Sequence, residues 1–156
     1  MSLSALCLEC GLCCDGTLFR QVKISPAERD ELVALGIGVG QKSKHDVMWL
    51  PCGKLAGKCC TIYEARPGGC RRFVCTLGQR LVDDTLTLDE ARGHVREMLA
   101  ALAALREVFA PPEGVPALRH ARACIDSTTT QVTLAQLQAF QKVESLRYGV
   151  FMPPPG

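Results

Sequence analysis

A chain of 156 residues is long enough for one compact domain, and a composition of 47% hydrophobic and 22% charged residues is globular rather than disordered or collagen-like. A net charge of +2 is too small to indicate a nucleic-acid partner. Residues 1–80 carry 11 Lys or Arg against 7 Asp or Glu, so the basic excess lies where most cysteines lie. Such cations would offset the negative charge of metal-bound thiolates.

Ten cysteines are the outlying feature of the composition, and nine of them precede residue 76. Such density is typical of a secreted disulfide framework or of metal ligation in a reducing compartment. The segment before Cys7 has no basic start and no apolar core, so we expect no signal peptide and a cytoplasmic protein. No run of about 18 apolar residues occurs, so we also expect no membrane-spanning helix. These observations favour metal ligation over disulfide bonds.

The first elements are predicted from short-range patterns. Residues 7–14 are dense in cysteine, and we expect them to form a loop. Residues 17–24 alternate roughly between polar and apolar side chains, which predicts a β-strand. Its apolar residues, which would share one face, are Leu18, Val22 and Ile24.

A helix is predicted directly after this strand. Ser25 can cap its N-terminus, Glu28 completes a capping box, and Pro26 suits the first turn. Gly36 is expected to end the helix. Residues 36–47 then hold three glycines among several polar residues, and we interpret them as a loop.

Residues 48–50 predict a short strand, whereas residues 51–75 are too rich in Gly, Pro, Cys and Arg to form long regular elements. That stretch needs another source of rigidity, which a bound metal would supply. From residue 81 the pattern is helical. The helices expected there begin at a capping box at Thr87 and run to about Phe109, then lie at about residues 116–124 and 133–149.

Together these patterns predict an α+β fold. Residues 1–80 would form a small, irregular, metal-stapled, cysteine-rich module, and residues 81–150 would form C-terminal helices packed on it in one compact domain. An apolar stripe at helical spacing along the longest helix is interpreted as core. Residues 151–156 are expected to form a frayed tail.

The first cysteine group consists of Cys7, Cys10, Cys13 and Cys14. A two-residue spacer lets the chain turn so that two sulfurs face one centre, as in zinc sites and iron–sulfur clusters. Adjacent side chains tend to point apart, so Cys13 and Cys14 are not expected to bind one ion side by side. They could instead serve two neighbouring centres.

The second group lies beyond the predicted strand and helix, which would fold back and bring the two groups together. Its members are Cys52, Cys59, Cys60, Cys70 and Cys75. The two groups hold enough thiols for two four-thiolate centres, and four-sulfur sites without histidine suit zinc or iron–sulfur clusters. Cys124 stands alone in the helical half and is interpreted as a small buried apolar residue.

Arginines and aromatic residues flank the second group. Arg66 is expected to tie loop carbonyls together, while Arg71 and Arg72 either offset thiolate charge or are solvated. Tyr63 and Phe73 are expected to pack over the site and exclude water.

The ordered motifs Cys7-Leu-Glu-Cys10-Gly11-Leu-Cys13-Cys14, Pro51-Cys52-Gly and Cys60-Thr-Ile-Tyr63, with Arg66-Pro67-Gly-Gly-Cys70-Arg71-Arg-Phe73-Val-Cys75, span residues 7–75. They resemble the YkgJ-like cysteine-cluster family, also called the CxxCxxCC zinc- or iron-chelating domain. The resemblance implies eight metal ligands, which are Cys7, Cys10, Cys13, Cys14, Cys52, Cys60, Cys70 and Cys75. Cys59 and Cys124 fall outside the family pattern, and Val74 stands where many relatives have proline.

Two functions from different classes remain open. One is an iron–sulfur protein with a redox or electron-transfer role, an oxidoreductase component, which the ferredoxin-like spacing of the first three cysteines and the lack of histidine ligands favour. The other is a zinc-stapled binding or adaptor module without catalytic activity, in which the metal supplies folding energy. Metal sequestration or delivery is a third reading, which would require an exchangeable ion. We expect a redox or protein partner rather than nucleic acid or membrane.

Overall fold

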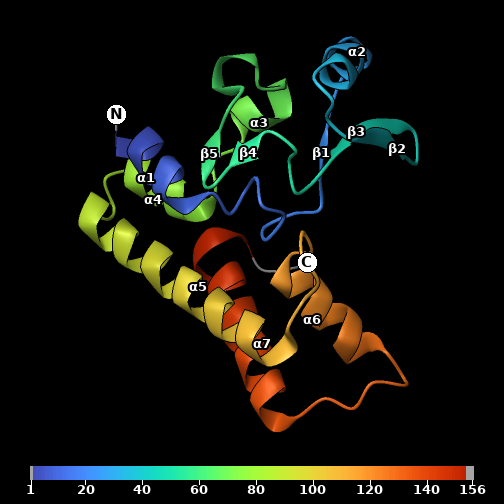
Figure 1. Cartoon of the computed structure of the whole chain (residues 1–156). Helices are drawn as coiled ribbons and strands as arrows, with labels where there is room; N and C mark the ends of the chain where they lie inside the picture. The colour runs from blue at the N-terminus through green and yellow to red at the C-terminus, as the bar shows by residue number, and fades with distance from the viewer. Residues whose placement is uncertain (1, 154–156) are drawn as a thin grey trace. The chain divides into compact units, whose positions relative to one another are not determined.

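The computed structural model describes residues 2–153, which divide into two compact units that are described separately (Figure 1). The cysteine unit comprises residues 7–74, and the helical unit comprises residues 2–6 and 75–153. Helices together with small antiparallel sheets confirm the predicted α+β fold. The division falls just before Cys75, and the boundary expected from the sequence lies after residue 80.

The first helix, α1 (Ser2–Cys10), includes two cysteines that were expected in a loop. Residues 7–10 are therefore helical, because alanine, leucine and glutamate around them all favour the helix. Gly11 follows with φ of 71°, and its N–H donates to the Cys7 carbonyl at 3.2 Å. A glycine at positive φ is a common helix end. The expected loop is thus limited to the turns that follow Gly11.

The larger sheet of the cysteine unit is antiparallel, with strand order β1-β3-β2. Its strands are β1 (Gln21–Lys23), β2 (Val39–Lys42) and β3 (His45–Trp49). The loop expected over residues 36–47 is therefore wrong, since most of it pairs as a hairpin. Glycine is unfavourable inside a strand, but a Cβ built on Gly40 would lie 2.7 Å from Trp49 Nε1. The indole ring thus covers the glycine and compensates for its missing side chain.

Helix α2 (Pro26–Ala34) begins and ends where the sequence predicts. Ser25 and Glu28 form the complete capping box, and Gly36 follows the helix with φ of 72°. The helix packs on the sheet through a small apolar core. The buried members of that core are Ile24, Leu32, Ile37, Met48 and Leu50.

Residues 51–74 contain only short regular pieces, as expected. These pieces are the paired strands β4 (Leu55–Ala56) and β5 (Cys59–Cys60), the 3₁₀ turn Tyr63–Ala65 and helix α3 (Gly68–Arg72). Cys52 and Cys70, at either end of this stretch, are half-buried and pack against the apolar core of the unit. Two of the predicted metal ligands are therefore in contact with the apolar core of the unit.

Besides the first residues of α1, the helical unit contains four helices and a π-helical segment among its described residues. They are α4 (Thr76–Val82), α5 (Leu88–Phe109), α6 (Ala117–Asp126), α7 (Leu134–Leu146) and the π-helical segment Arg147–Phe151. The capping boxes at Thr87 and Thr133 start α5 and α7, while α4 was not predicted. Helices α5 and α7 lie side by side (Figure 1).

The predicted apolar stripe of α5 is confirmed as core. Its buried members are Val95, Met98, Leu105 and Phe109. Phe151 is also fully buried, so the expected frayed tail does not begin at this residue. A buried phenylalanine removes a large apolar surface from water, which holds the end of the described chain in place. The rest of the predicted tail, residues 154–156, lies outside the described residues.

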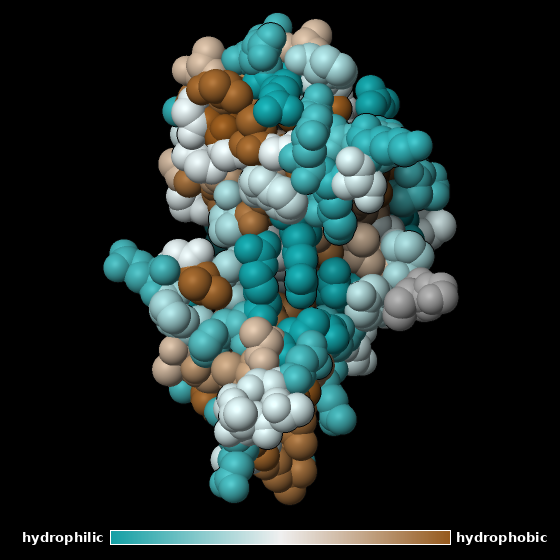
Figure 2. Space-filling model, turned by 90° about the vertical axis from the view of Figure 1, so that its right-hand side faces the viewer, coloured by the Kyte–Doolittle hydropathy of each residue, from teal (hydrophilic) through white to brown (hydrophobic). Residues whose placement is uncertain are grey.

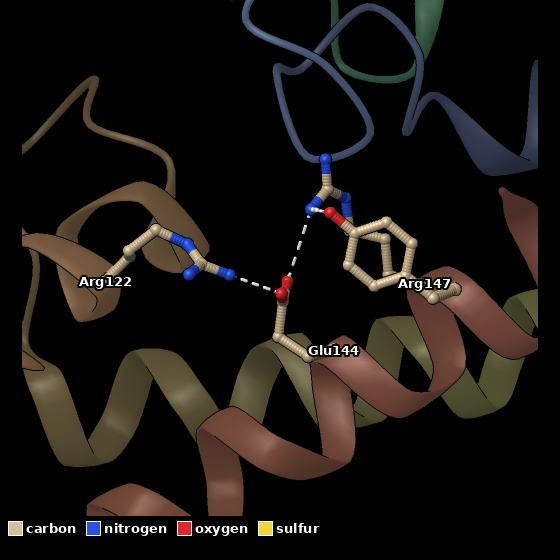
Figure 3. Close-up of polar contacts among 4 residues, drawn as sticks. Arg122, Glu144 and Arg147 are labelled. Carbon is tan, nitrogen blue, oxygen red and sulfur yellow. Dashed lines mark hydrogen bonds and ion pairs between the residues drawn. The ribbon is translucent and has the colours of Figure 1, made fainter. Parts of the chain in front are cut away.

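Charged side chains link α6 to the end of α7 (Figure 3). Arg122 on α6 and Arg147 both form ion pairs with Glu144, and Arg147 also donates to the hydroxyl of Tyr148 at 2.8 Å. The Glu144 and Arg147 side chains are each 17% exposed. Partly buried charges of this kind require each other, since removing one partner leaves the other poorly solvated.

Hydrophilic side chains cover much of the face shown in Figure 2, and hydrophobic residues form separate groups among them. Within the described residues, no helix combines the length and the apolar composition needed to cross a bilayer.

Candidate metal centre

Backbone hydrogen bonds connect three of the cysteine-bearing segments of the cysteine unit. The Cys52 N–H donates to the Cys14 carbonyl at 2.8 Å. The Leu55 N–H donates to the Cys52 carbonyl at 3.0 Å, and Leu55 pairs with Cys60 across the β4–β5 ladder. The main chain alone therefore fixes Cys14, Cys52 and Cys60 relative to one another.

The fourth cysteine of this region, Cys70, lies on α3, and one carboxylate positions that helix. Glu28 Oε1 accepts from the Gly68 N–H at 2.5 Å, while Glu28 Oε2 accepts from the Ser25 N–H at 2.8 Å. The same side chain thus completes the capping box of α2 and holds the start of α3. These hydrogen bonds of Glu28 fix the helix that carries Cys70 relative to the N-terminus of α2, which was predicted correctly from the sequence.

Cys14 and Cys70 each lie close enough to neighbouring thiols for the charge of those thiols to raise their pKa. Burial, followed by the neighbouring thiols of Cys70, Cys60 and Cys52, raises the pKa of Cys14 to about 12. Burial, Cys52 and Cys60 likewise raise the pKa of Cys70 to about 11, against a lowering effect of Arg66. Thiolates that repel one another in a poorly solvated place favour either protons or a bound cation.

Across residues 2–153, no three His, Cys, Asp or Glu side chains already have the spacing of ligands around a metal ion. The residue types present nevertheless suit a metal ion, because thiols are ligands for zinc and iron. Cys14, Cys52, Cys60 and Cys70 are all half-buried thiols. Rotation about a single Cα–Cβ bond moves each sulfur without moving the main chain. Four thiolates suit zinc or iron. Rotation of the four cysteine side chains would be needed to bring their sulfurs to ligand distance from one metal ion.

The remaining cysteines occupy different surroundings. Cys7 is exposed and Cys10 half-buried on α1, and Cys13 is half-buried in the following turn. Cys59 is exposed beside Cys60 on β5, where successive side chains point to opposite faces. This alternation explains why the Cys59 side chain is exposed while that of Cys60 is half-buried.

Two further cysteines lie in the helical unit. Cys75 caps α4, and its sulfur accepts from the Gly78 N–H at 3.3 Å, a role that was not predicted from the sequence. Burial raises the pKa of Cys75, and the hydrogen bond from Gly78 opposes this. Cys124 is half-buried on α6, with its sulfur 3.6 Å from His120 Nε2. Metal ligation by Cys75 remains a prediction.

A family model named CxxCxxCC, described as a "putative zinc- or iron-chelating domain", matches residues 6–92, more than half of the chain. The chain belongs to the CxxCxxCC family. This confirms the resemblance seen in the cysteine motifs, and the match extends beyond the last of them through α4 into α5. No curated protein and no solved structure matches the chain. A metal-binding role therefore fits both the family and the set of thiols.

Arginines hold the loop of the CxxCxxCC domain that precedes Cys70. Arg66 Nε donates to the Tyr63 carbonyl at 2.8 Å, and its guanidinium lies 3.5 Å from the centre of the Tyr63 ring. Arg71 donates to the carbonyls of Arg66 and Glu64, at 2.6 and 3.0 Å. Both arginines thus tie loop carbonyls together, as expected for Arg66.

The two aromatic residues expected to cover the site are partly exposed. Tyr63 is 37% and Phe73 36% exposed. Tyr63 stacks with Arg66, and Phe73 makes an edge-to-face contact with Phe19 at 4.6 Å between ring centres. Their rings therefore support the loop and strand beside the CxxCxxCC thiols, and exclusion of water by them remains a prediction.

Replacing Gly69 with alanine should weaken the contact between α3 and β1. A Cβ on Gly69 would lie 2.6 Å from Val22 Cγ1 and 2.8 Å from the Lys23 carbonyl oxygen. A main-chain oxygen cannot rotate away, so the helix itself must shift. Crowding of this kind costs about 1–3 kcal/mol. Because α3 carries Cys70, the Gly69→Ala variant should also release metal faster than the unmodified CxxCxxCC protein.

Urea unfolding followed by tryptophan fluorescence measures the loss of stability, since Trp49 is the single tryptophan and lies in the same unit. Gly38→Ala is the matched control, because no atom lies within 4 Å of a Cβ at that position. Equal unfolding midpoints for the two variants would contradict the close approach of α3 to β1.

Stability should depend on the ionisation of Glu28. Hydrogen bonds from the Gly68 and Ser25 N–H groups lower the pKa of this carboxyl in the folded state. A lowered pKa adds stability above the unfolded-state value of about 4.3, and this stability is lost as the pH falls through the folded-state pKa. Glu28→Gln retains an acceptor but loses the charge, so it should cost roughly 1 kcal/mol at pH 7.

The difference in unfolding free energy between the Glu28→Gln variant and the unmodified protein should narrow as the pH is lowered from 7 to below 4, through the folded-state pKa of Glu28. Glu31→Gln, at an exposed position on the same helix, is the control and should show little difference at either pH. A difference that stays constant with pH would show that the charge of Glu28 does not contribute.

Proposed function

We propose that the chain is a metal-stapled binding or adaptor module in which Cys14, Cys52, Cys60 and Cys70 hold one zinc ion. The observation that carries this proposal is the convergence of four half-buried cysteines from four separate segments of one unit, which hydrogen bonds between those segments hold in place. The thiols of Cys52 and Cys60 raise the pKa of both Cys14 and Cys70. Four thiolates without histidine are a common structural zinc site. Such a site contributes folding free energy rather than chemistry.

The small core of the cysteine unit supports a structural role for the metal. Its regular elements are short, with strands of two to five residues and an α3 of five. Units of this size bury too little apolar surface to be stable by packing alone, and many use a metal instead. The four thiols join the least regular stretch, residues 51–74, to the segment that precedes β1.

An iron–sulfur protein with a redox or electron-transfer role is the second candidate. The spacing of Cys7, Cys10 and Cys13 favours it, and four thiolates hold a cluster as well as they hold zinc. A bound cluster would supply one-electron chemistry, with a separate redox partner. Either candidate would function in a reducing compartment, in keeping with the cytoplasm expected from the sequence.

Elemental analysis of protein purified without oxygen tests both candidates. Zinc protein should be colourless, whereas a cluster should give a brown protein with visible absorption and acid-labile sulfide. Cys60→Ser should abolish binding at the four-thiol site, whereas Cys59→Ser, the adjacent exposed cysteine, should leave it intact. Unmodified protein without zinc or iron, or full metal content in Cys60→Ser, would contradict the proposal.

A further inference from the structure

We infer that the free edge of β1 binds an extended, acidic peptide segment of a partner protein, which adds to the larger sheet as a further strand. The binding groove lies between β1 and α3, inside the cysteine unit, and its lining includes none of the four proposed zinc ligands. The inference rests on the binding or adaptor role proposed above and names the chemistry of the partner.

Among the described residues, β1 pairs with another strand along one edge only, because it is the terminal strand in the order β1-β3-β2. The Ile24 N–H donates to the Asp46 carbonyl at 3.0 Å. The Leu50 N–H donates to the Arg20 carbonyl, also at 3.0 Å. Main-chain groups alternate in direction along an antiparallel strand, so those of Gln21 face away from β3. Such an edge is a template for a further strand.

A groove of about 680 Å³ lies along this edge. Phe19 and Phe73 supply apolar surface in it, with an edge-to-face contact at 4.6 Å between ring centres, and Phe73 is 36% exposed. Gly69 of α3 approaches the Lys23 carbonyl oxygen, since a Cβ on this glycine would lie 2.8 Å from it. The added strand should therefore pair mainly through Gln21, with its apolar side chains beside the two phenylalanines.

The charges that line the groove favour an acidic segment. Lys23 on β1 and Arg72 on α3 both line it and are both exposed. Of the described residues in the lining, only Glu28 is acidic. Its two carboxylate oxygens already accept from the N–H groups of Gly68 and Ser25, at 2.5 and 2.8 Å. An acidic side chain on a strand beside β1 would thus be attracted by both cations.

A second copy of this chain fits the same edge less well. Pairing β1 with the β1 of another copy would bring two Arg20 and two Lys23 side chains together, and like charges on neighbouring strands are destabilising. An acidic segment avoids this repulsion. Successive side chains of a strand point to opposite faces, so the segment expected here alternates acidic with apolar residues.

Fluorescence anisotropy with a labelled peptide, measured on the metal-loaded full chain, tests the inference. The probe Glu-Val-Glu-Phe-Glu-Val-Glu should bind, and its affinity should fall as salt is added. Trp49, the single tryptophan, lies opposite Gln21 in the β1–β3 register, so its fluorescence should change on binding. The basic counterpart, with lysine in place of each glutamate, should bind at least about tenfold more weakly.

Two variants separate charge from main-chain pairing. Lys23→Glu should weaken binding of the acidic probe about tenfold, whereas Lys42→Glu, an exposed lysine on the other edge strand β2, should leave it unchanged. Gln21→Pro removes an N–H that faces the groove, and proline is tolerated on the free side of an edge strand. This variant should abolish binding without changing the metal content. Lys23→Glu alters an exposed side chain, so it stays informative if Gln21→Pro does not fold.

Equal affinity for the acidic and basic probes, unchanged binding in Lys23→Glu, or no binding by protein with its full metal content would overturn the inference. A dimer of the unmodified chain that Gln21→Pro converts to a monomer would also overturn it, since a second copy would then occupy the edge. Unmodified protein without zinc or iron would instead contradict the proposed function, and that measurement does not involve the peptide.

Discussion

Removing the metal should unfold the cysteine unit while the helical unit stays folded. A structural zinc site contributes on the order of 10 kcal/mol to folding, which is comparable with the entire stability of a typical domain. The apolar core of the cysteine unit is small among the described residues, so packing is not expected to replace that contribution. The helical unit has its own core on α5 and α7 and should not depend on the thiols.

Hydrogen exchange on the full chain before and after chelation measures this effect. Amides of β2 and β3 should lose protection, whereas those in the middle of α5 should keep it. Adding zinc back should restore protection in the sheet, which serves as the control for damage during chelation. Protected β2 and β3 amides in protein shown by elemental analysis to be metal-free would contradict a structural role for the ion.

Replacing Phe151 with alanine should destabilise the helical unit and leave the cysteine unit folded, the reverse of what metal removal should do. This ring is fully buried and belongs to the π-helical segment after α7, which contacts α4 and α7. Truncating a buried phenylalanine removes its apolar burial and leaves a cavity, at a cost of about 3–5 kcal/mol. The helical unit should lose exchange protection while metal content stays unchanged.

Leu134→Ala is the control for this variant, because Leu134 lies on α7 but is 70% exposed. It should change the free energy of unfolding by less than about 0.5 kcal/mol. Similar destabilisation by both variants would show that Phe151 contributes no more to the free energy of unfolding than an exposed residue does. The frayed tail expected there would then extend to Phe151.

The starts of α2, α5 and α7 were predicted correctly because their signals are local. Ser25, Thr87 and Thr133 each form a capping box in the structure. The bonds of a capping box join residues three apart, so the sequence of one turn contains all the partners. The apolar stripe of α5 was readable for the same reason, since its period is a property of a single helix.

Elements that depend on distant partners were missed or wrong. Residues 36–47 were expected as a loop because of their glycines, yet Gly40 lies in a strand whose neighbour supplies the ring of Trp49. Phe151 was expected in a frayed tail because prolines follow it, yet it is fully buried in the helical unit. In both cases contacts across the fold outweigh local propensity.

The order of the cysteine motifs by itself determined the family, the expectation of metal binding and the set of eight candidate ligands. The main-chain contacts that connect Cys14, Cys52 and Cys60 were decided only by the tertiary structure. Spacing along the chain shows which cysteines can approach one another. It does not distinguish Cys13 from Cys14, because the two neighbours lie at almost the same sequence distance from the second cysteine group. Which of them meets the distant thiols depends on main-chain contacts such as the one from Cys52 to Cys14, and these form only when the chain folds.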